Sequence, residues 1–145
     1  MNEPPFEEIE HTADWAIRVR GRDLRGLFEA AARGMFTLLV DLAHVAPERT
    51  LELDLHGIDA ETLLVDWLNE LLYQSEDKDI AFRDFHITSL DTSMTSHAPA
   101  MARLHATVVG GPVHELRRPI KAATFNALAI RHLDNGYEAE IVFDV

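Results

Sequence analysis

The chain has 145 residues and a mass of 16.3 kDa, a length that favours one globular domain over residues 1–145. Thirteen Lys and Arg residues against 25 Asp and Glu residues give a formal net charge of −12. This charge argues against direct binding to an RNA backbone or an anionic membrane. Because cysteine is absent, disulfide bonds, thiolate nucleophiles and cysteine-based zinc sites are excluded.

The N-terminal segment has neither the basic part nor the apolar part of a secretory signal. No apolar stretch approaches the roughly 18 residues that a membrane span needs. A cytoplasmic protein with no membrane association is therefore expected.

Apolar periodicity predicts a strand, a helix, a second strand and a second helix in the first half of the chain. The strands alternate apolar and polar side chains, whereas the helices repeat apolar residues every three to four positions. An aspartate that can cap a helix, Asp23 or Asp59, precedes each helix. The strands are expected at 15–20 and 50–56, and the helices at 24–42 and from 59 to the charged stretch 75–79.

The second half of the sequence indicates strands and turns with one short helix. Two glycines followed by a proline at 110–112 are typical of a turn. A helix is expected at 119–127, because proline is tolerated in a first helical turn. Asn135-Gly136 is a strong hairpin signal. The strands are expected near 81–90 and 101–109, with a terminal hairpin of 128–132 and 137–143.

This order of elements indicates an α+β fold in which two amphipathic helices pack on one side of a mostly antiparallel or mixed sheet. A doubly wound parallel fold is less favoured, because the second half has few helices. Trp15 and Trp67 are expected in the core.

Two acidic segments are candidate sites. The segment HTAD (11–14) lies at the entrance of the first strand, where polar side chains often only stabilise a turn. In the last strand, side-chain alternation places Asp144 on the same face as Glu138 and Glu140. Asp144 also adjoins the terminal carboxylate, and such like charges are unfavourable unless a cation or a lysine offsets them.

Familiar catalytic motifs are missing. The sequence has no phosphate-binding loop, dinucleotide fingerprint, zinc-protease helix, nucleophile elbow or EF-hand loop. Its eight histidines show no metal-binding spacing on a predicted helix. Function cannot be assigned from a catalytic motif.

Four segments, taken together and in this order, resemble the archease family over nearly the whole chain. They are EHTADWAIRVRG, LLVDWLNELLY, PIKAATFNALAI and, at the end, GYEAEIVFDV. The resemblance implies an α+β fold with two helices against a strongly curved sheet. It also implies a cytoplasmic cofactor protein for RtcB-type RNA ligases, which join RNA ends in tRNA splicing and RNA repair. Such a protein promotes GMP transfer from GTP to the ligase and repeated turnover, and is not itself an enzyme.

The family resemblance also implies a divalent-metal site, seen with calcium. Carried over residue by residue, its ligands are Asp14, Asp144 and the terminal Val145, and magnesium or manganese are alternatives to calcium. Lys121 stands where the family has a functionally important lysine beside this acidic cluster. The residues that the resemblance links to ligase activation are Lys121, His11, Asp14 and Asp144. Oxygen donors suit hard cations.

One departure and several alternatives stay open. Phe125-Asn126 stands where Tyr-His is commoner in the family, so no role of that imidazole transfers. Lys121 can instead form an ordinary salt bridge with Asp14 or Asp144. The whole chain can be a general acidic chaperone for nucleic-acid-processing or other basic proteins, or a metal-dependent hydrolase in which His11 or Asp14 activates water. The partner is expected to be the ligase, with RNA contacted only through it.

Overall fold

A computed structural model describes residues 5–9, 15–92 and 102–145. In chain order the elements are β1 (Phe6–Ile9), β2 (Trp15–Gly21), α1 (Leu24–Leu39), the short 3-10 helix η1 (Leu42–His44), β3 (Arg49–Gly57), α2 (Ala60–Lys78), β4 (Ile80–Asp91), β5 (Ala102–Pro112), β6 (Ala122–Ala123), β7 (Arg131–Leu133) and β8 (Gly136–Asp144).

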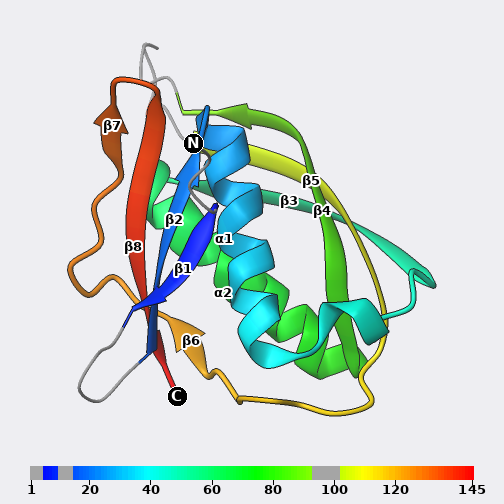
Figure 1. The fold of residues 1–145 in the computed structure, drawn as a ribbon. Helices are drawn as coiled ribbons and strands as arrows, with labels where there is room; N and C mark the ends of the chain where they lie inside the picture. Colours follow the sequence, from blue (N-terminus) through cyan, green and yellow to red (C-terminus); the bar gives the residue numbers. More distant parts are fainter. Residues whose placement is uncertain (1–4, 10–14, 93–101) are drawn as a thin grey trace.

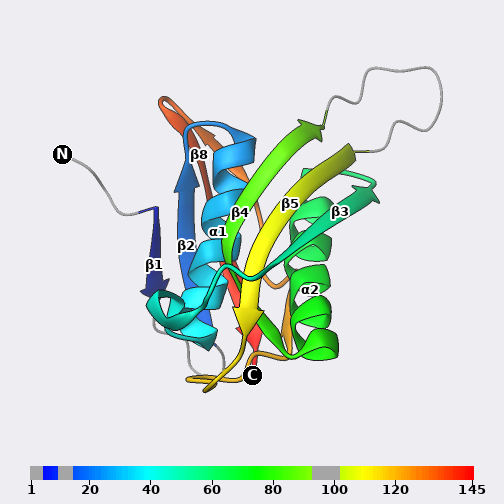
Figure 2. The same ribbon diagram turned by 90° about the vertical axis from the view of Figure 1, so that its right-hand side faces the viewer.

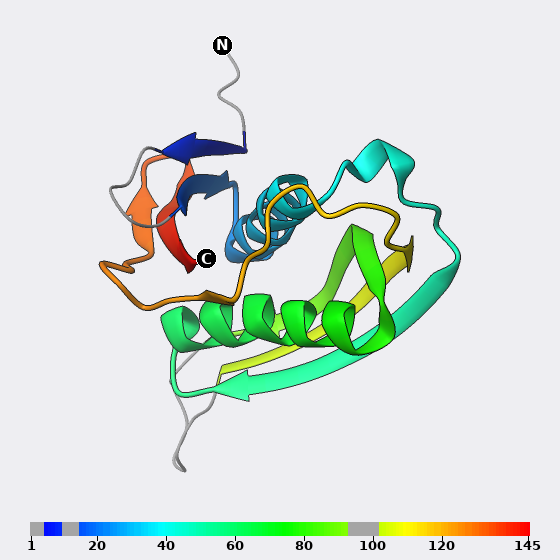
Figure 3. The same ribbon diagram turned by 90° about the horizontal axis from the view of Figure 1, so that it is seen from below.

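The strands form two antiparallel sheets, and the two long helices lie between them (Figure 1 and Figure 3). One sheet has the order β1-β2-β8-β6, with β7 also paired to β8, and the other has the order β3-β5-β4. Figure 2 shows the three-stranded sheet in front of both helices. The predicted α+β class with antiparallel pairing is confirmed, but the strands form two sheets with the helices between them and not the single sheet that was expected.

The first helix is shorter than predicted. Asp23 caps it as expected, because its carboxylate accepts the backbone N–H of Gly26 at 2.7 Å. The helix ends at Leu39, since Val40 is extended. The Asp41 carboxylate then accepts the N–H of Ala43 and begins η1. The predicted end at Leu42 was therefore wrong by three residues.

The second helix agrees with its prediction and fixes the packing of the core. Asp59 caps its N-terminus, because the Asp59 carboxylate accepts the backbone N–H of Thr62 at 2.8 Å. The helix is terminated by Asp79, which has the left-handed conformation at φ 53°. Trp67 is fully buried, and its indole N–H donates to the carbonyl of Phe28 in α1 at 2.9 Å. The predicted core position of Trp67 is confirmed, whereas Trp15 is only partly buried.

Gly110 and Gly111 lie within β5, so the predicted turn at 110–112 was wrong. A Cβ atom on Gly110 would lie 2.0 Å from the carbonyl oxygen of Ala81, and one on Gly111 would lie 2.2 Å from that of Ala46. Both glycines are needed because other backbone segments approach the strand closely.

The predicted helix at 119–127 was also wrong. The segment contains the two-residue strand β6 and ends in a turn at 126–127, where Ala127 is left-handed at φ 55°. Its backbone instead forms hydrogen bonds to β8. The N–H of Lys121 donates to the backbone carbonyl of Asp144 at 2.8 Å, and the N–H of Thr124 donates to that of Val142 at 3.0 Å. These tertiary hydrogen bonds override the helix propensity of the alanines. The terminal hairpin is confirmed, with Leu133 paired to Gly136, although its first strand covers 131–133 and not the predicted 128–132.

No helix in the described part of the chain is long and apolar enough to cross a membrane.

Gly110→Ala should lower the free energy of unfolding by about 3 kcal/mol, the upper end of what over-packing costs, because the new methyl group meets backbone atoms that cannot rotate away. Gly26→Ala is the matched control, since its Cβ would lie 3.1 Å from the tip of the Asp23 side chain and no closer than 3.8 Å to backbone atoms outside its own helix. Urea unfolding of the two variants checks this. A Gly110→Ala protein as stable as the native chain would contradict the explanation of the glycines.

Candidate functional site

Strand pairing brings Lys121 and Asp144 together at one end of the five-stranded sheet. Ala122 is paired with Asp144, and the Lys121 N–H donates to the Asp144 carbonyl at 2.8 Å. On the other edge of β8, Trp15 is paired with Phe143. In Figure 1 the C-terminus lies beside β6 at the lower end of the sheet. The two residues expected to act together are therefore adjacent through their backbones.

Asn69 of α2 holds β6 against the helix, a role that the sequence analysis missed. Its amide group makes two hydrogen bonds to Ala123: Oδ1 accepts from the backbone N–H at 2.8 Å, and Nδ2 donates to the carbonyl at 3.1 Å. The side chain thus satisfies both backbone groups of Ala123. The helical periodicity gave no signal for this role, because Asn69 stands with Asp66 and Glu70 among the polar positions of the helix.

Arginines neutralise Glu138 on the outer face of β8. Glu138 is 8% exposed, and its carboxylate accepts hydrogen bonds from Arg20, at 2.9 Å, and from Arg131. Arg20 and Arg131 belong to the strands on either side of β8. A buried carboxylate needs such partners to offset its lost hydration.

A third arginine joins the next carboxylates along this face. Arg18 binds Glu7 of β1 at 2.8 Å and lies 3.6 Å from Glu140 of β8. The hydrogen bond to Glu7, and then the negative charge of nearby glutamates, hold the pKa of Arg18 above its usual value. Among the residues that the structure describes, no basic side chain forms an ion pair with Asp144, at the end of the same face.

The predicted site residues fall into two groups. Asp144 and Lys121 are exposed, and Val145 is 36% exposed. His11 and Asp14 lie outside the described residues. Within the described ranges no ion pair joins Lys121 to Asp144, and no three His, Asp or Glu side chains form a metal-binding group. The expected ligand set therefore remains a prediction that depends on Asp14.

Arg118 links the segment before β6 to the first two strands. Its guanidinium lies over the Trp15 ring, 4.8 Å from the centroid, and forms an ion pair with Glu8 at 2.5 Å. The segment therefore has anchors both at Arg118 and at Lys121, and Trp15 has a polar neighbour that its predicted core position did not foresee.

The residues that depart from the common family wording lie on the surface. Phe125 is 56% exposed, and the backbone N–H of Asn126 donates to the Thr124 hydroxyl at 3.2 Å. Neither residue is needed to fill the core.

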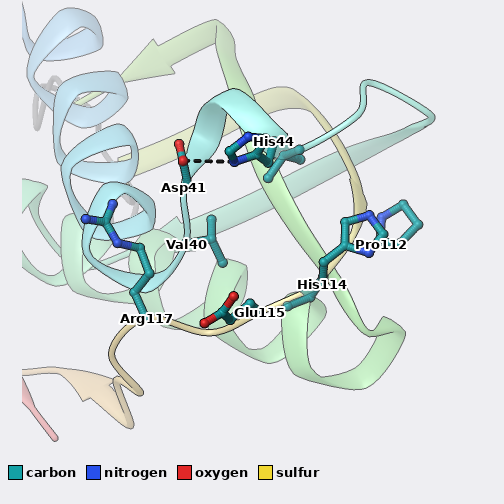
Figure 4. A pocket seen from close by; sticks show the side chains of 9 residues that line it. Val40, Asp41, His44, Pro112, His114, Glu115 and Arg117 are labelled. Carbon is teal, nitrogen blue, oxygen red and sulfur yellow. Dashed lines mark ion pairs between the residues drawn. The ribbon is translucent and has the colours of Figure 1, made fainter.

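Two cavities lie along the segment between β5 and β6. One, of about 330 Å³, has an apolar lining that includes Leu39, Leu72 and Ile120, with Lys121 at its wall. The other, of about 770 Å³, lies between η1 and the start of the segment (Figure 4). Its polar groups include Asp41 and His44, which form an ion pair at 2.9 Å. Of these two cavities, the smaller one shares Lys121 with the Lys121–Asp144 site.

Comparisons with known proteins agree on one family. The model of the Archease protein family (MTH1598/TM1083) matches residues 6–145. The archease of Methanosarcina barkeri is 32% identical over 145 residues, covering 97% of this chain and 95% of its own. The archease of Saccharolobus islandicus strain M.14.25 is 36% identical over 140 residues, covering 97% and 98%.

Two solved structures have this fold. The solution structure of Methanobacterium thermoautotrophicum protein 1598 has a TM-score of 0.83 at 28% identity, and the match covers 99% of this chain and all of that one. A Thermotoga maritima archease, described as a possible chaperone, has a TM-score of 0.55 at 18% identity, with 100% and 98% covered. The fold thus places the chain among small α+β proteins in which two sheets enclose two helices. Together with the relatives, it shows that the chain belongs to the archease family.

Asn69→Ala should lower the free energy of unfolding by about 1–3 kcal/mol, because it leaves the N–H and C=O of Ala123 without partners. Hydrogen exchange at the Ala123 amide should become faster, and exchange at the Lys121 amide should also become faster. Asn126→Ala is the control, an exposed asparagine on the same segment. Unchanged exchange at Ala123 in Asn69→Ala would show that the amide does not hold β6.

Proposed function

We propose that this chain activates an RtcB-type RNA ligase by promoting its guanylylation from GTP, and so supports multiple turnover in tRNA splicing and RNA repair. Membership of the archease family is the basis for this partner. The observation that supports the site is the backbone pairing of Lys121 with Asp144, next to the Trp15–Phe143 pair. Asp14 directly precedes Trp15 in the sequence.

A divalent cation fits the donors that this chain offers. The Asp144 carboxylate is exposed and has no cationic partner among the described side chains. With the Val145 carboxylate and Asp14, it would supply only oxygen ligands, which calcium, magnesium and manganese accept. Three such groups leave coordination positions for water or for a ligand from the partner. The bound ion would supply positive charge that attracts a phosphate or a carboxylate.

Lys121 supplies a second, permanent positive charge at this end of the sheet. Its backbone is fixed by Asp144, while its exposed side chain forms no ion pair with that carboxylate in the described structure. The ammonium group is therefore available to meet a phosphate group or an acidic side chain of the ligase.

The net charge of −12 favours a protein partner over direct RNA binding. An RNA ligase needs basic surfaces to hold its substrate, and an acidic protein is attracted to such surfaces while it is repelled by the RNA phosphates. RNA would thus be affected only through the ligase.

GMP transfer from labelled GTP to an RtcB-type ligase, with and without this chain, tests the proposal. The native chain should stimulate transfer, and Asp14→Ala, Asp144→Ala and Lys121→Ala should each reduce the stimulation by about tenfold or more, as loss of a metal ligand or its neighbour does. A few extra residues after Val145 should have the same effect, because they convert its carboxylate into an amide.

Asp134→Ala is the matched control, since Asp134 is an exposed aspartate at the opposite end of the terminal hairpin. It should stimulate the ligase like the native chain. An active ligase that the native chain does not stimulate would exclude the proposed function. Retained stimulation in both Lys121→Ala and Asp144→Ala would exclude the proposed site.

The alternative, a general acidic chaperone, is favoured by the description of the Thermotoga maritima relative as a possible chaperone. Such a protein would suppress aggregation of several unrelated basic proteins. It would also tolerate Asp144→Ala, because bulk charge rather than one site would carry the activity. Aggregation assays with the same variants separate the two functions.

A further inference from the structure

Most sheet edges of this protein carry a feature that limits pairing with another chain. β1 has four residues, and β6 has two residues covered by the Asn69 amide. β4 contains two register shifts, and at the second of them the carboxylate of Glu29 accepts the N–H of Ile87. Short strands, irregularities and covering groups are the usual protections of exposed edges.

The free edge of β3 has none of these protections. The strand runs for nine residues from Arg49 to Gly57, is paired with β5 in one unbroken register, and contains neither proline nor lysine. Within the described ranges, its backbone bonds to no element other than β5. In Figure 3 β3 is the outermost strand of its sheet, and its free edge is the one that faces away from β5.

The side chains of β3 define what could pair with this edge. Glu52 and Asp54 point to the outer face and are exposed, with Thr50 and His56 on either side. On the inner face Leu51 and Leu55 remain partly exposed although Leu53 is buried. A complementary strand would alternate basic side chains on the outer face with apolar side chains on the inner face.

A second copy of this chain does not fit well. Antiparallel pairing of two β3 strands centred on Leu53 would place Glu52 opposite Asp54 of the other copy, twice, and like charges directly opposite each other are destabilising. The net charge of −12 adds to this repulsion.

We therefore propose that the free edge of β3 binds an extended basic segment of a partner protein by strand addition. Main-chain hydrogen bonds to β3 would provide affinity, and pairing of Lys or Arg side chains with Glu52 and Asp54 would provide selectivity. This surface is formed by residues other than those of the Lys121–Asp144 site, and the inference does not depend on ligase activation.

Titration of the isotope-labelled chain with a synthetic ten-residue peptide of alternating lysine and valine tests the proposal. Saturable NMR shift changes and slower amide exchange should be confined to residues 49–57 and their immediate neighbours. The same peptide with N-methylated backbone amides keeps its charge but cannot form the ladder, and it should bind at least about tenfold more weakly.

Glu52→Lys with Asp54→Lys should also weaken binding of the unmodified peptide by about tenfold. Glu76→Lys with Asp77→Lys is the control, because it makes the same charge change at two exposed residues of α2. Strand addition would be overturned if the N-methylated peptide bound as tightly as the unmodified one, or if the NMR shift changes were centred away from β3. It would also be overturned if both double variants weakened binding equally. Self-association of the native chain in sedimentation, with NMR shift changes at residues 49–57, would overturn the proposal that a basic partner occupies this edge.

Discussion

The pairing of β8 in the middle of its sheet is the constraint on which the rest of the structure depends. One edge of β8 is bonded to the whole length of β2, and the other edge is shared by β7 and β6. Phe143 is fully buried in the core that the helices form with both sheets. Because β8 extends to Asp144, the same pairing that stabilises the core also fixes the position of the candidate site.

The charges along β8 are paired in the middle of the strand and unpaired, among the described residues, at its end. Glu138 and Glu140 have arginine partners from neighbouring strands, whereas Asp144 has none among the described residues. The carboxylate of Asp144, unpaired within the described ranges, would make the end of β8 a place for a metal ion or for a basic group of a partner. The free edge of β3, in the three-stranded sheet, is a separate acidic surface.

Local signals predicted the parts of the fold that depend on nearby residues. Both helix caps, Asp23 and Asp59, and the terminal hairpin were predicted correctly, because capping and Asn-Gly turns are encoded within a few positions. Long-range contacts decided the rest. Gly110 lies in a strand because the Ala81 backbone approaches it, and the segment 121–124 is not helical because β8 and Asn69 bind its backbone. β1 was missed because four residues are too few to show a period.

The candidate site was predictable to a similar extent. Alternation along the last strand placed Asp144 on the face of Glu138 and Glu140, but only the family resemblance linked it to Lys121, which the structure brings to its backbone. Asn69 was not predicted, since its partner lies 54 positions away. Sequence patterns identify the charged groups, whereas the fold determines which of them meet.

Titration with manganese followed by NMR is the most direct test of the account, because the paramagnetic ion broadens signals from nearby nuclei. If a metal ion binds at the end of β8, the amides of Lys121, Ala122, Asp144 and Val145 should broaden first, at concentrations that leave the acidic end of α2 unaffected, and calcium should reverse the effect. Broadening that begins at Glu76 to Asp79, or that spreads evenly over the acidic surface, would contradict a metal site at the end of β8.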